Sequence, residues 1–437
     1  SLQAVAAAWR ACVAGTGSVR VTRAPLDGYR GIVLTQAWAG TYCTELLGFM
    51  GADIIQVEVR KRPDSWRGAY DAPVAERLKE LGATNPWNCN YLYNSVNLNK
   101  RCLTLDLQTA EGADVYRRLL PLSDFVVENF SPRVLGNLGF AYEQMAALRP
   151  GIILCSLSAY GHDGPWANIP GIGGTIEPTS GLSALLGYAG GPPLNSGIMY
   201  PDAVAGLNAF AAILAALRHR ERTGEGQYID LSMQEANLVF AGEAAMEYLR
   251  TGRQRERMGN RHPAFAPHGI FPCLGEDRWI AVACETEWQW QQLVGALGRP
   301  PALAAGEFAE NRLRKANEIA LEERLAAFTR GWDRDDLVAR LLAAGVIAAP
   351  VHDAIEVAGD EPLRGRGVIG PVAHPEAGEW LQARIPWRYS ASQAPPVRPA
   401  PRLGEHSAEV LAELLGMGPE DYQQLVNKGV SGEGPPD

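Results

Sequence analysis

Residues 31–59 read GIVLTQAWAGTYCTELLGFMGADIIQVEV, and this stretch decides the fold. Residues 31–35 are an apolar run typical of a buried strand, and residues 42–50 have the length and pattern of a helix. Gly51 ends that helix, and residues 52–59 predict a second strand. A strand, a helix and another strand within about 30 residues make a βαβ unit. We therefore expect an α/β fold built on a Rossmann-like parallel sheet.

Polar and aromatic residues stand where successive strands of this predicted sheet end. Arg60 follows the second strand, Asn129-Phe130 closes a strand at 124–130, and Ser158-Ala159-Tyr160 closes a later strand. Since ligands of open α/β sheets gather outside the carboxyl ends of the strands, we expect a ligand crevice there. The turn after the first strand lacks Gly-x-Gly-x-x-Gly, which argues against a nicotinamide or flavin site.

A second informative stretch, residues 196–206, reads SGIMYPDAVAG. The apolar spacing that follows predicts a helix of roughly 18 residues that starts near Asp202 and ends before Gly224. A carboxylate at the positive end of a helix dipole should stay ionised at neutral pH. Aspartate is also a common N-cap, so the local pattern alone leaves open whether Asp202 caps the helix or reacts as a nucleophile. Another helix is expected over residues 232–251.

The rest of the chain predicts a smaller region of mixed structure and a return to helix. Residues 269–273 and 279–284 indicate a hairpin. Helices dominate between this hairpin and a strand at 346–351. The segment 374–401 is extended and proline-rich, and a final helix begins near Ser407.

Composition narrows the class of protein. The 437 residues carry a net charge of −9 and are 46% hydrophobic, which favours a multidomain globular protein over a nucleic-acid binder. The seven cysteines include no Cys-x-x-Cys pair, which indicates free thiols in a reducing compartment. No uninterrupted apolar run reaches the roughly 18 residues of a membrane span. We expect a cytoplasmic protein that binds neither nucleic acid nor membrane.

The sequence lacks the motifs of several other kinds of site. The histidines show no metal-ligand spacing, so we expect no metal. No Gly-x-Ser-x-Gly elbow exists, and Gly171-Ile172-Gly173-Gly174 is not followed by the Lys-Ser/Thr of a phosphate loop. His162-Asp163 lies between glycines and is interpreted as part of a turn. Basic residues cluster between Arg60 and Arg67, and the pattern alone leaves open a solvated face or a binding site.

Asp202 and the residues after it resemble the signature of the family III coenzyme A transferases, the CaiB–BaiF family. The resemblance rests on Asp202, AALRHR at 215–220, TGEGQ at 223–227 and DLSMQEA at 230–236. Four further stretches look like family landmarks in the right order, namely 46–58, 127–132, 156–161 and 403–411. The similarity spans roughly residues 25–428, and it implies that Asp202 is a covalent nucleophile.

The resemblance also implies an interlocked dimer, in which two chains are threaded through one another. A homodimer is expected, with a homologous second subunit as an alternative. A catalytically silent subunit of a hetero-oligomer stays open as a different class, although such a chain would be expected to lack Asp202. The expected parts are an N-terminal extension at 1–25, a large Rossmann-like domain at 26–225 with the Asp202 helix, a smaller α+β domain at 226–335, and a C-terminal return to the large domain at 336–437.

Coenzyme A, carried as an acyl-CoA substrate, is expected over the ends of the strands. The resemblance departs from the family at three positions: a family glutamine is Trp38 here, a family arginine falls on Val59 beside Arg60, and a second basic residue falls on Asn137. Arginines suit the phosphates because each guanidinium donates paired hydrogen bonds. The expected contacts are Arg60, Arg67, Asn129, Phe130, Arg133, Tyr160 and Trp38.

The reaction implied by the resemblance moves CoA from an acyl-CoA, with succinyl-CoA the expected donor, to a carboxylic acid through an aspartyl-CoA thioester on Asp202. Glycine N–H groups at Gly190-Gly191 or Gly259 are expected to stabilise the oxyanions. Trp38 beside Met199-Tyr200 suggests an apolar pocket for a larger acceptor such as an aryl-substituted succinate. The alternative for Trp38 is a core position without a role in substrate choice.

An acyl-CoA racemase or epimerase of the same superfamily is the alternative activity. Its aspartate also matches Asp202, so that residue does not separate the two. Its histidine falls in the loop occupied here by Gly171-Ile172-Gly173, and the absence of a histidine there favours transfer.

Overall fold

A computed structural model describes residues 23–70 and 73–436, and the chain divides into two compact units. The large unit takes in the described residues of Ser1–Leu182, Ser196–Gly242 and Pro362–Asp437, and the small unit takes in Ser183–Asn195 and Glu243–Glu361. The N-terminal extension expected at 1–25 lies almost entirely outside the described residues.

The large unit is built on a six-stranded sheet in the order β3-β2-β1-β4-β5-β6, and every neighbouring pair is parallel. This is the doubly wound Rossmann order, which confirms the predicted α/β fold. The order reverses between β1 and β4, so a crevice is expected outside their carboxyl ends. The strands are β1 Arg30–Leu34, β2 Asp53–Glu58, β3 Lys100–Thr104, β4 Phe125–Glu128, β5 Ile153–Ser158 and β6 Gln227–Ser232.

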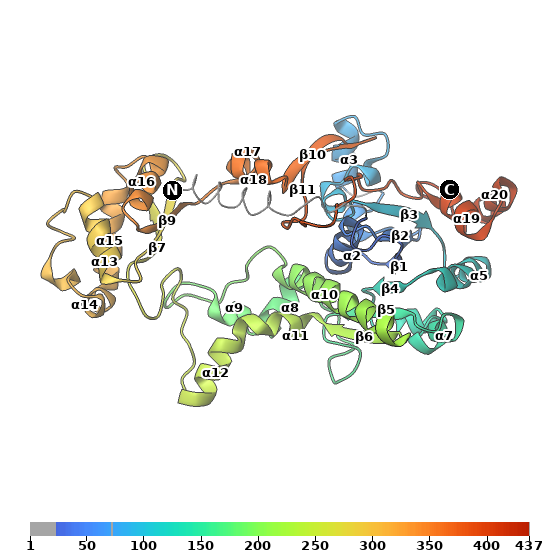
Figure 1. The fold of residues 1–437 in the computed structure, drawn as a ribbon, viewed down its shortest axis with the longest axis horizontal. Coiled ribbons are helices and arrows are strands. Elements are labelled where there is room, and N and C mark those ends of the chain that lie inside the picture. Colours follow the sequence, from blue (N-terminus) through green and yellow to red (C-terminus); the bar gives the residue numbers. More distant parts are fainter. Residues whose placement is uncertain (1–22, 71–72, 437) are drawn as a thin grey trace. The chain divides into compact units, whose positions relative to one another are not determined.

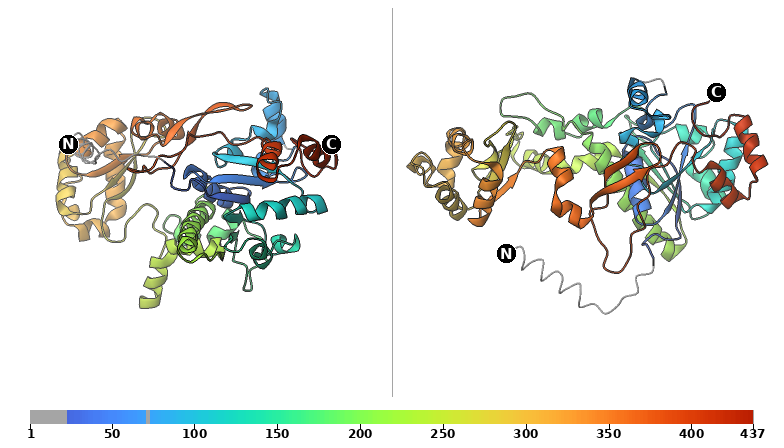
Figure 2. Two further views of the ribbon diagram at one scale, coloured as in Figure 1. Left: turned by 45° about the vertical axis from the view of Figure 1, so that its right-hand side comes forward. Right: turned by 90° about the horizontal axis from the view of Figure 1, so that it is seen from above.

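Helices cover both faces of this sheet (Figures 1 and 2). Val127 and Ile153 point to one face, where they pack with α2 and α10, while Val126 and Leu154 point to the other, where they pack with α5, α7 and α19. Because side chains alternate along a strand, continuous apolar runs fill both cores. The helices are α2 Ala39–Phe49, α5 Ala110–Leu119, α7 Tyr142–Leu148, α10 Tyr200–Thr223, α19 Ser407–Leu415 and α20 Pro419–Asn427.

Helix α10 starts earlier than its pattern predicts. It has 24 residues, its N-cap is Met199 with a left-handed φ of 50°, and Asp202 is its third residue. The N-cap interpretation of Asp202 is therefore wrong. By length and a mean hydropathy of 1.4, α10 also passes the test for a membrane span, contrary to expectation, but its residues, such as Ala209 and Ile213, form the core against α2.

Shorter elements connect this framework. The helix expected over 232–251 is broken into α11 Met233–Leu238, a 3₁₀ turn Val239–Ala241 and α12 Gly242–Thr251. The extended segment near 374 contains an antiparallel hairpin, β10 Ile369–His374 with β11 Gly378–Ala383. The remaining elements of this unit are η1 Ser65–Arg67, α3 Pro73–Glu80, η2 Pro86–Asn88, α4 Tyr91–Asn94, η3 Leu120–Leu122, α6 Val134–Asn137, α8 Gly173–Thr179 and, at its boundaries, α9 Leu182–Leu185 and α18 Glu361–Arg366.

The small unit has its own sheet and core. Strand β8 Trp279–Ala283 pairs antiparallel with β7 His268–Pro272 and with β9 Ile347–Pro350, which confirms the predicted hairpin. Trp290 and Phe308 are buried in the core beside it. The other elements are η5 Gly306–Phe308, α13 Glu287–Ala296, α14 Asn311–Ala316, α15 Glu318–Thr329, α16 Arg334–Ala343 and α17 Ala354–Gly359.

The unit boundaries differ from those expected at 226 and 336. Strand β6 pairs with β5, so the large unit continues to Gly242. Strand β9 pairs with β8, so the small unit continues to Glu361. Sheet pairing between distant segments decides both boundaries, and the local sequence pattern does not record it.

Candidate functional site

The Asp202 carboxyl group lies where the N-termini of two helices meet. Backbone N–H groups of Asp202 itself, in α10, and of Ala39, at the start of α2, lie near it and favour its charged form. The residue is only 9% exposed, and its Oδ2 has no hydrogen-bond partner among the described residues. A Cβ added at Gly173 would collide with this Oδ2, so the close approach of the chain requires glycine there.

Burial governs the acidity of this group. It raises the pKa of Asp202 to about 6, while the two backbone N–H groups act in the opposite direction. The carboxyl group is thus mostly ionised at pH 7, although its pKa lies above the ordinary value and not below it, as a helix terminus alone would predict. A carboxylate with few hydrogen bonds in a water-poor site is a better nucleophile than a fully solvated one.

Asp202 opens into a cavity of about 350 Å³, which is large enough for a small acyl group. Its walls come from the turn after β1, the loop after β2, the loops after β4 and β5, and α10 and α11. They are formed by Gln36, Ala37, Ser65, Trp66, Asn129, Phe130, Ser131, Pro132, Leu157, Ser158, Ala159, Ala167, Asn168, Ile169, Pro170, Gly171, Ile172, Gly173, Met199, Asp202 and Met233.

A second cavity, of about 430 Å³, adjoins the first. The two share Gln36, Asn129, Phe130 and Ser131 as a common wall. Asn129 holds this wall by accepting the Gln36 N–H and donating to the Gln36 carbonyl, at 2.8 Å each, across the point where the strand order reverses. Asn129 and Phe130 thus line the cavities at the strand ends, and their contact with the coenzyme stays a prediction.

Lys61 and Arg62 supply positive charge to the second cavity, and sequence reasoning did not assign them. The Lys61 ammonium pairs with Asp106 at 3.0 Å, and Arg62 is exposed. Their position directly after β2 is the same signal that singled out Arg60, so the strand-end rule applied one or two residues further would have found them.

Arg60 has a different role from the one expected. Its guanidinium donates to the carbonyls of Ser431, Gly434 and Pro435 at 3.1, 2.9 and 2.6 Å. These bonds hold the C-terminal segment and replace the expected role as a phosphate counter-charge.

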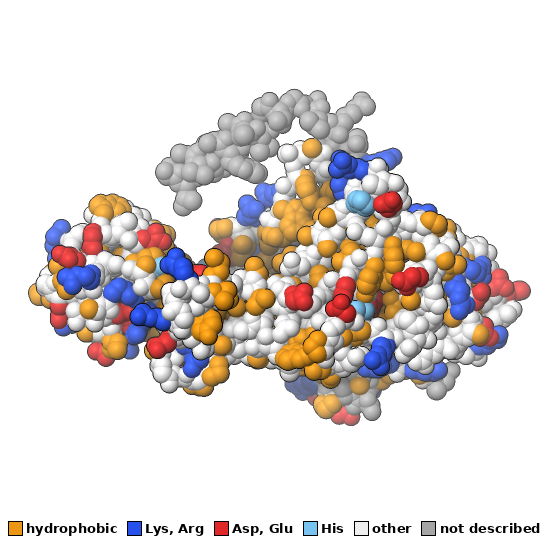
Figure 3. Space-filling view, turned by 90° about the horizontal axis from the view of Figure 1, so that it is seen from below, with side chains coloured by type: hydrophobic (Ala, Val, Ile, Leu, Met, Phe, Trp, Pro, Cys, Tyr) orange, Lys and Arg blue, Asp and Glu red, His pale blue; other side chains and the backbone are white. Residues whose placement is uncertain are grey.

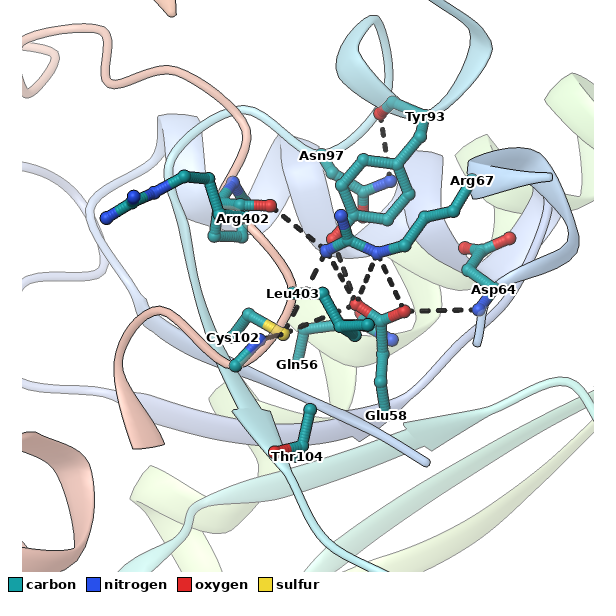
Figure 4. Close-up of polar contacts among 12 residues, drawn as sticks. Gln56, Glu58, Asp64, Arg67, Tyr93, Asn97, Cys102, Thr104, Arg402 and Leu403 are labelled. Carbon is teal, nitrogen blue, oxygen red and sulfur yellow. Dashed lines mark hydrogen bonds and ion pairs between the residues drawn. The ribbon is translucent and has the colours of Figure 1, made fainter. Parts of the chain in front are cut away.

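Arg67 is also assigned wrongly by the sequence. Its side chain is fully buried, pairs with Glu58 at 2.9 Å, and lies 3.6 Å from the centre of the Tyr93 ring. Figure 4 shows Glu58 as the centre of this cluster, with bonds to Arg67, to the Tyr93 hydroxyl and to the Asp64 N–H. A buried guanidinium with this set of partners is unavailable to a ligand.

Neither cavity is lined by the other expected coenzyme contacts, Trp38, Tyr160 and Arg133. Trp38 is half-buried and is not part of either cavity wall, but its ring centre is 5.9 Å from that of Trp66, which is. Tyr160 packs edge-on against Trp166 at 5.1 Å, next to the wall at Ala159. Arg133 is exposed at the start of α6.

Two of the glycines expected to bind oxyanions, Gly191 and Gly259, have N–H groups that already donate to other carbonyls. The Gly259 N–H donates to the Gly187 carbonyl at 2.8 Å, and the Gly191 N–H donates to the Tyr188 carbonyl at 2.9 Å. All four residues belong to the small unit, whereas Asp202 belongs to the large unit.

Comparison with known proteins identifies the class that this fold and site define. Residues 26–407 match CoA-transferase family III, and the chain belongs to that family. Among solved structures, a CaiB/BaiF family protein from Brucella suis is similar with a TM-score of 0.79 and 32% identity, over 90% of this chain and 100% of that one. The expected family and the expected enzyme class, a CoA-transferase, are thereby confirmed.

Two relatives with known activities are similar over nearly their whole length. One is a succinate–glutarate CoA-transferase of Agrobacterium fabrum, 31% identical over 89% of this chain and 96% of its own. The other is a succinyl-CoA–D-citramalate CoA-transferase of Chloroflexus aurantiacus, 32% identical over 93% of this chain and 98% of its own. A third relative, 32% identical, is the beta subunit of a succinyl-CoA–L-malate CoA-transferase of the same bacterium.

Arg67 and Arg62 allow a matched test of their different roles, since Arg67 is buried in an ion pair and Arg62 lines the second cavity. Replacing Arg67 by Met leaves Glu58 buried without its cation, so we expect the large unit to lose about 3–5 kcal/mol of stability. Replacing exposed Arg62 by Met should leave stability within about 0.5 kcal/mol and raise the KM for acyl-CoA. Urea unfolding and steady-state kinetics measure both effects. An Arg67 variant of unchanged stability but raised KM would contradict the structural role.

Proposed function

We propose that this protein moves CoA from succinyl-CoA to a carboxylic acid, with Asp202 as the covalent nucleophile. The observation that carries this proposal is the Asp202 carboxyl group, which is buried on the wall of a cavity with one oxygen unpartnered among the described residues. Asp64 and Glu128 also have a buried oxygen without a partner in the described part of the chain, but of these three carboxyl groups only Asp202 lines this cavity.

The reaction proceeds by two exchanges through mixed anhydrides. The Asp202 carboxylate attacks the donor thioester, which forms an anhydride and releases the CoA thiolate. The thiolate attacks the Asp202 carbonyl carbon, which forms the aspartyl-CoA thioester and releases succinate. The acceptor carboxylate attacks that thioester and again displaces the thiolate. The thiolate then attacks the acceptor's acyl carbon, so that the new acyl-CoA leaves and the Asp202 carboxylate is restored.

The two adjoining cavities suit the two parts of the substrate. We place the acyl group in the cavity at Asp202 and the coenzyme in the cavity that contains Lys61 and Arg62, with the thioester crossing the wall at Asn129-Phe130. The positive side chains of the second cavity can pair with phosphates. On the face drawn in Figure 3, acidic and basic side chains are interspersed.

The relatives support succinyl-CoA as the donor, since two of them carry it in their names. For the acceptor, the cavity at Asp202 has Trp66, Phe130, Ile169, Met199 and Met233 in its walls. Such walls favour an acid with an apolar body, because a small dianion would lose hydration without full pairing. We therefore propose a larger acceptor such as an aryl-substituted succinate, with Trp66 in the role first expected of Trp38.

The racemase alternative fits the site less well. That activity needs a histidine in the loop at Gly171-Ile172-Gly173, and the backbone at Gly173 approaches Asp202 so closely that a side chain there would collide with it. The CoA-transferase relatives agree with this choice. The homodimer and the cytoplasmic location remain proposals, and the subunit relative keeps a second, homologous chain as an alternative partner.

The nucleophile is tested by Asp202→Asn and Asp202→Ala. Both should lose transfer by at least about 10⁴-fold, because no covalent intermediate forms, while the fold persists. Mass spectrometry of the protein after incubation with succinyl-CoA should show a CoA adduct in the wild type and none in the variants. Asp163→Asn, in an exposed loop, is the matched control. Substantial transfer by Asp202→Ala would rule out the proposed chemistry.

The pH profile reports the acidity of the nucleophile. Because burial raises the pKa of Asp202 to about 6, the protonated and unreactive form accumulates as the pH falls through that value. The logarithm of kcat/KM should therefore fall with unit slope below about pH 6 and be level between about pH 7 and 8. A profile that stays level down to about pH 4 would show that an ordinary carboxylate, or none, limits the reaction.

Acceptor choice is tested at Trp66. Replacing Trp66 by Ala should lower kcat/KM for phenylsuccinate by about tenfold or more, and for glutarate by less than about threefold, because only the aromatic acid uses the aromatic wall. Trp166→Ala is the control, since that indole is exposed and outside both cavities. Equal losses for both acids would show that Trp66 does not select the acceptor.

A further inference from the structure

Asp64 is a buried carboxyl group behind the cavity wall, and the proposed reaction does not use it. It lies after β2 and is the N-cap of η1, so its Oδ1 accepts the Trp66 N–H at 2.9 Å. The same oxygen also accepts the Ala37 N–H at 2.9 Å, from the turn after β1. Capping explains the bond from Trp66 but not the bond from Ala37, because the latter joins two loops that are distant in sequence.

The turn that contains Ala37 is the one that reaches the nucleophile. Ala37 has a left-handed φ of 56°, a conformation that a residue with a Cβ adopts only where its surroundings hold it. Two residues later, the Ala39 N–H lies near the Asp202 carboxyl group and favours its charged form. The turn at 37–39 is thus held at one end by Asp64 and contacts Asp202 at the other.

The support behind Asp64 is rigid. Its backbone N–H donates to Glu58 Oε2 at 3.1 Å, and Glu58 is fixed in turn by its buried ion pair with Arg67 (Figure 4). Burial, and next the nearby Glu58 carboxylate, raise the pKa of Asp64 to about 7. The uncharged form is therefore well populated at neutral pH, and asparagine is a close mimic of it.

We propose that Asp64 is a positioning residue, which fixes the turn at 37–39 so that the Ala39 N–H meets the Asp202 carboxyl group and Trp66 stays on the cavity wall. This inference rests on the proposed role of Asp202. A single buried oxygen, Asp64 Oδ1, then holds two parts of the cavity wall, at Ala37 and at Trp66. A shift of this turn moves the Ala39 N–H away from the nucleophile and changes the cavity wall, although Asp64 itself does not line the cavity.

A change in the pKa of Asp202 is measurable because few groups determine that pKa. Burial and the N–H groups of Asp202 and Ala39 account for its pKa, and no charged side chain of residues 23–70 or 73–436 contributes to it. Gly173 and Met233, from the elements packed beside it, carry no titratable group. Displacement of the Ala39 N–H should therefore raise the pKa of Asp202 and move the acid limb of the pH profile upward.

Asp64→Ser and Asp64→Asn separate this role from capping. Serine can still cap Trp66, but its shorter side chain cannot also hold Ala37, whereas asparagine keeps an acceptor oxygen in place. We expect Asp64→Ser to lower kcat by about 100-fold, as a 1 Å misplacement can. We also expect its acid limb to move to higher pH, because the Ala39 N–H that favours the charged form of Asp202 is displaced. Its Kd for CoA should stay unchanged.

Asp64→Asn should recover most of the lost activity and the original acid limb, and Asp163→Ala is the control in an exposed loop. Circular dichroism confirms that each variant is folded. A folded Asp64→Ser with normal kcat and an unmoved acid limb would overturn the proposal, as would an asparagine variant as impaired as the serine variant. Failure to find a CoA adduct on Asp202 would instead overturn the proposed function, and the kcat comparison of Ser with Asn would still decide the role of Asp64.

Discussion

The burial of one carboxyl group at the junction of two helices is the constraint on which the rest of the site depends. Asp202 sits at the start of α10, lies near the Ala39 N–H at the start of α2, and leaves room beside it only for a glycine. Both helices pack on the same face of the sheet, so their N-termini meet at its carboxyl edge. Burial there opposes ionisation while the backbone N–H groups support it, and the balance leaves a carboxylate that is charged at neutral pH but poorly solvated. That combination suits a nucleophile.

Around this group, a rigid framework carries the loops that form the cavities. Asn129 joins the turns after β1 and β4 at the point where the strand order reverses, and its wall serves both cavities. Behind the loop after β2, the Glu58–Arg67 pair is buried and fully bonded, so that loop can present Trp66 to one cavity while Lys61 and Arg62 face the other. Charge in this region therefore has two separate uses. Buried pairs hold the loops, and the exposed cations Lys61 and Arg62 are the groups that we propose for the coenzyme.

The sequence alone predicted the sheet and part of the candidate site. Most of the wrong predictions have a common cause, because they depend on contacts between distant segments. The βαβ pattern at 31–59 predicted the sheet, and the strand-end rule located Asn129 and Phe130. Periodicity could not show that Arg67 turns inward to Glu58 or that Arg60 turns to the C-terminal segment, because both partners are fixed by tertiary packing. Proline at the second position of α10 was compatible with a start at Tyr200, yet the carboxylate next to it suggested a cap. The unit boundaries failed for the same reason, since pairing of β6 and β9 with distant strands is not a local property.

The path of oxygen atoms tests the central claim most directly. If Asp202 forms an anhydride with the acceptor, the bond broken by the thiolate leaves one acceptor oxygen on the Asp202 carboxyl group. Turnover of succinyl-CoA with an acceptor whose carboxylates carry ¹⁸O should therefore label the peptide that contains Asp202, as read by mass spectrometry after digestion, and label should then appear in the released succinate. Transfer of CoA to the labelled acceptor while Asp202 keeps only ¹⁶O would contradict the account.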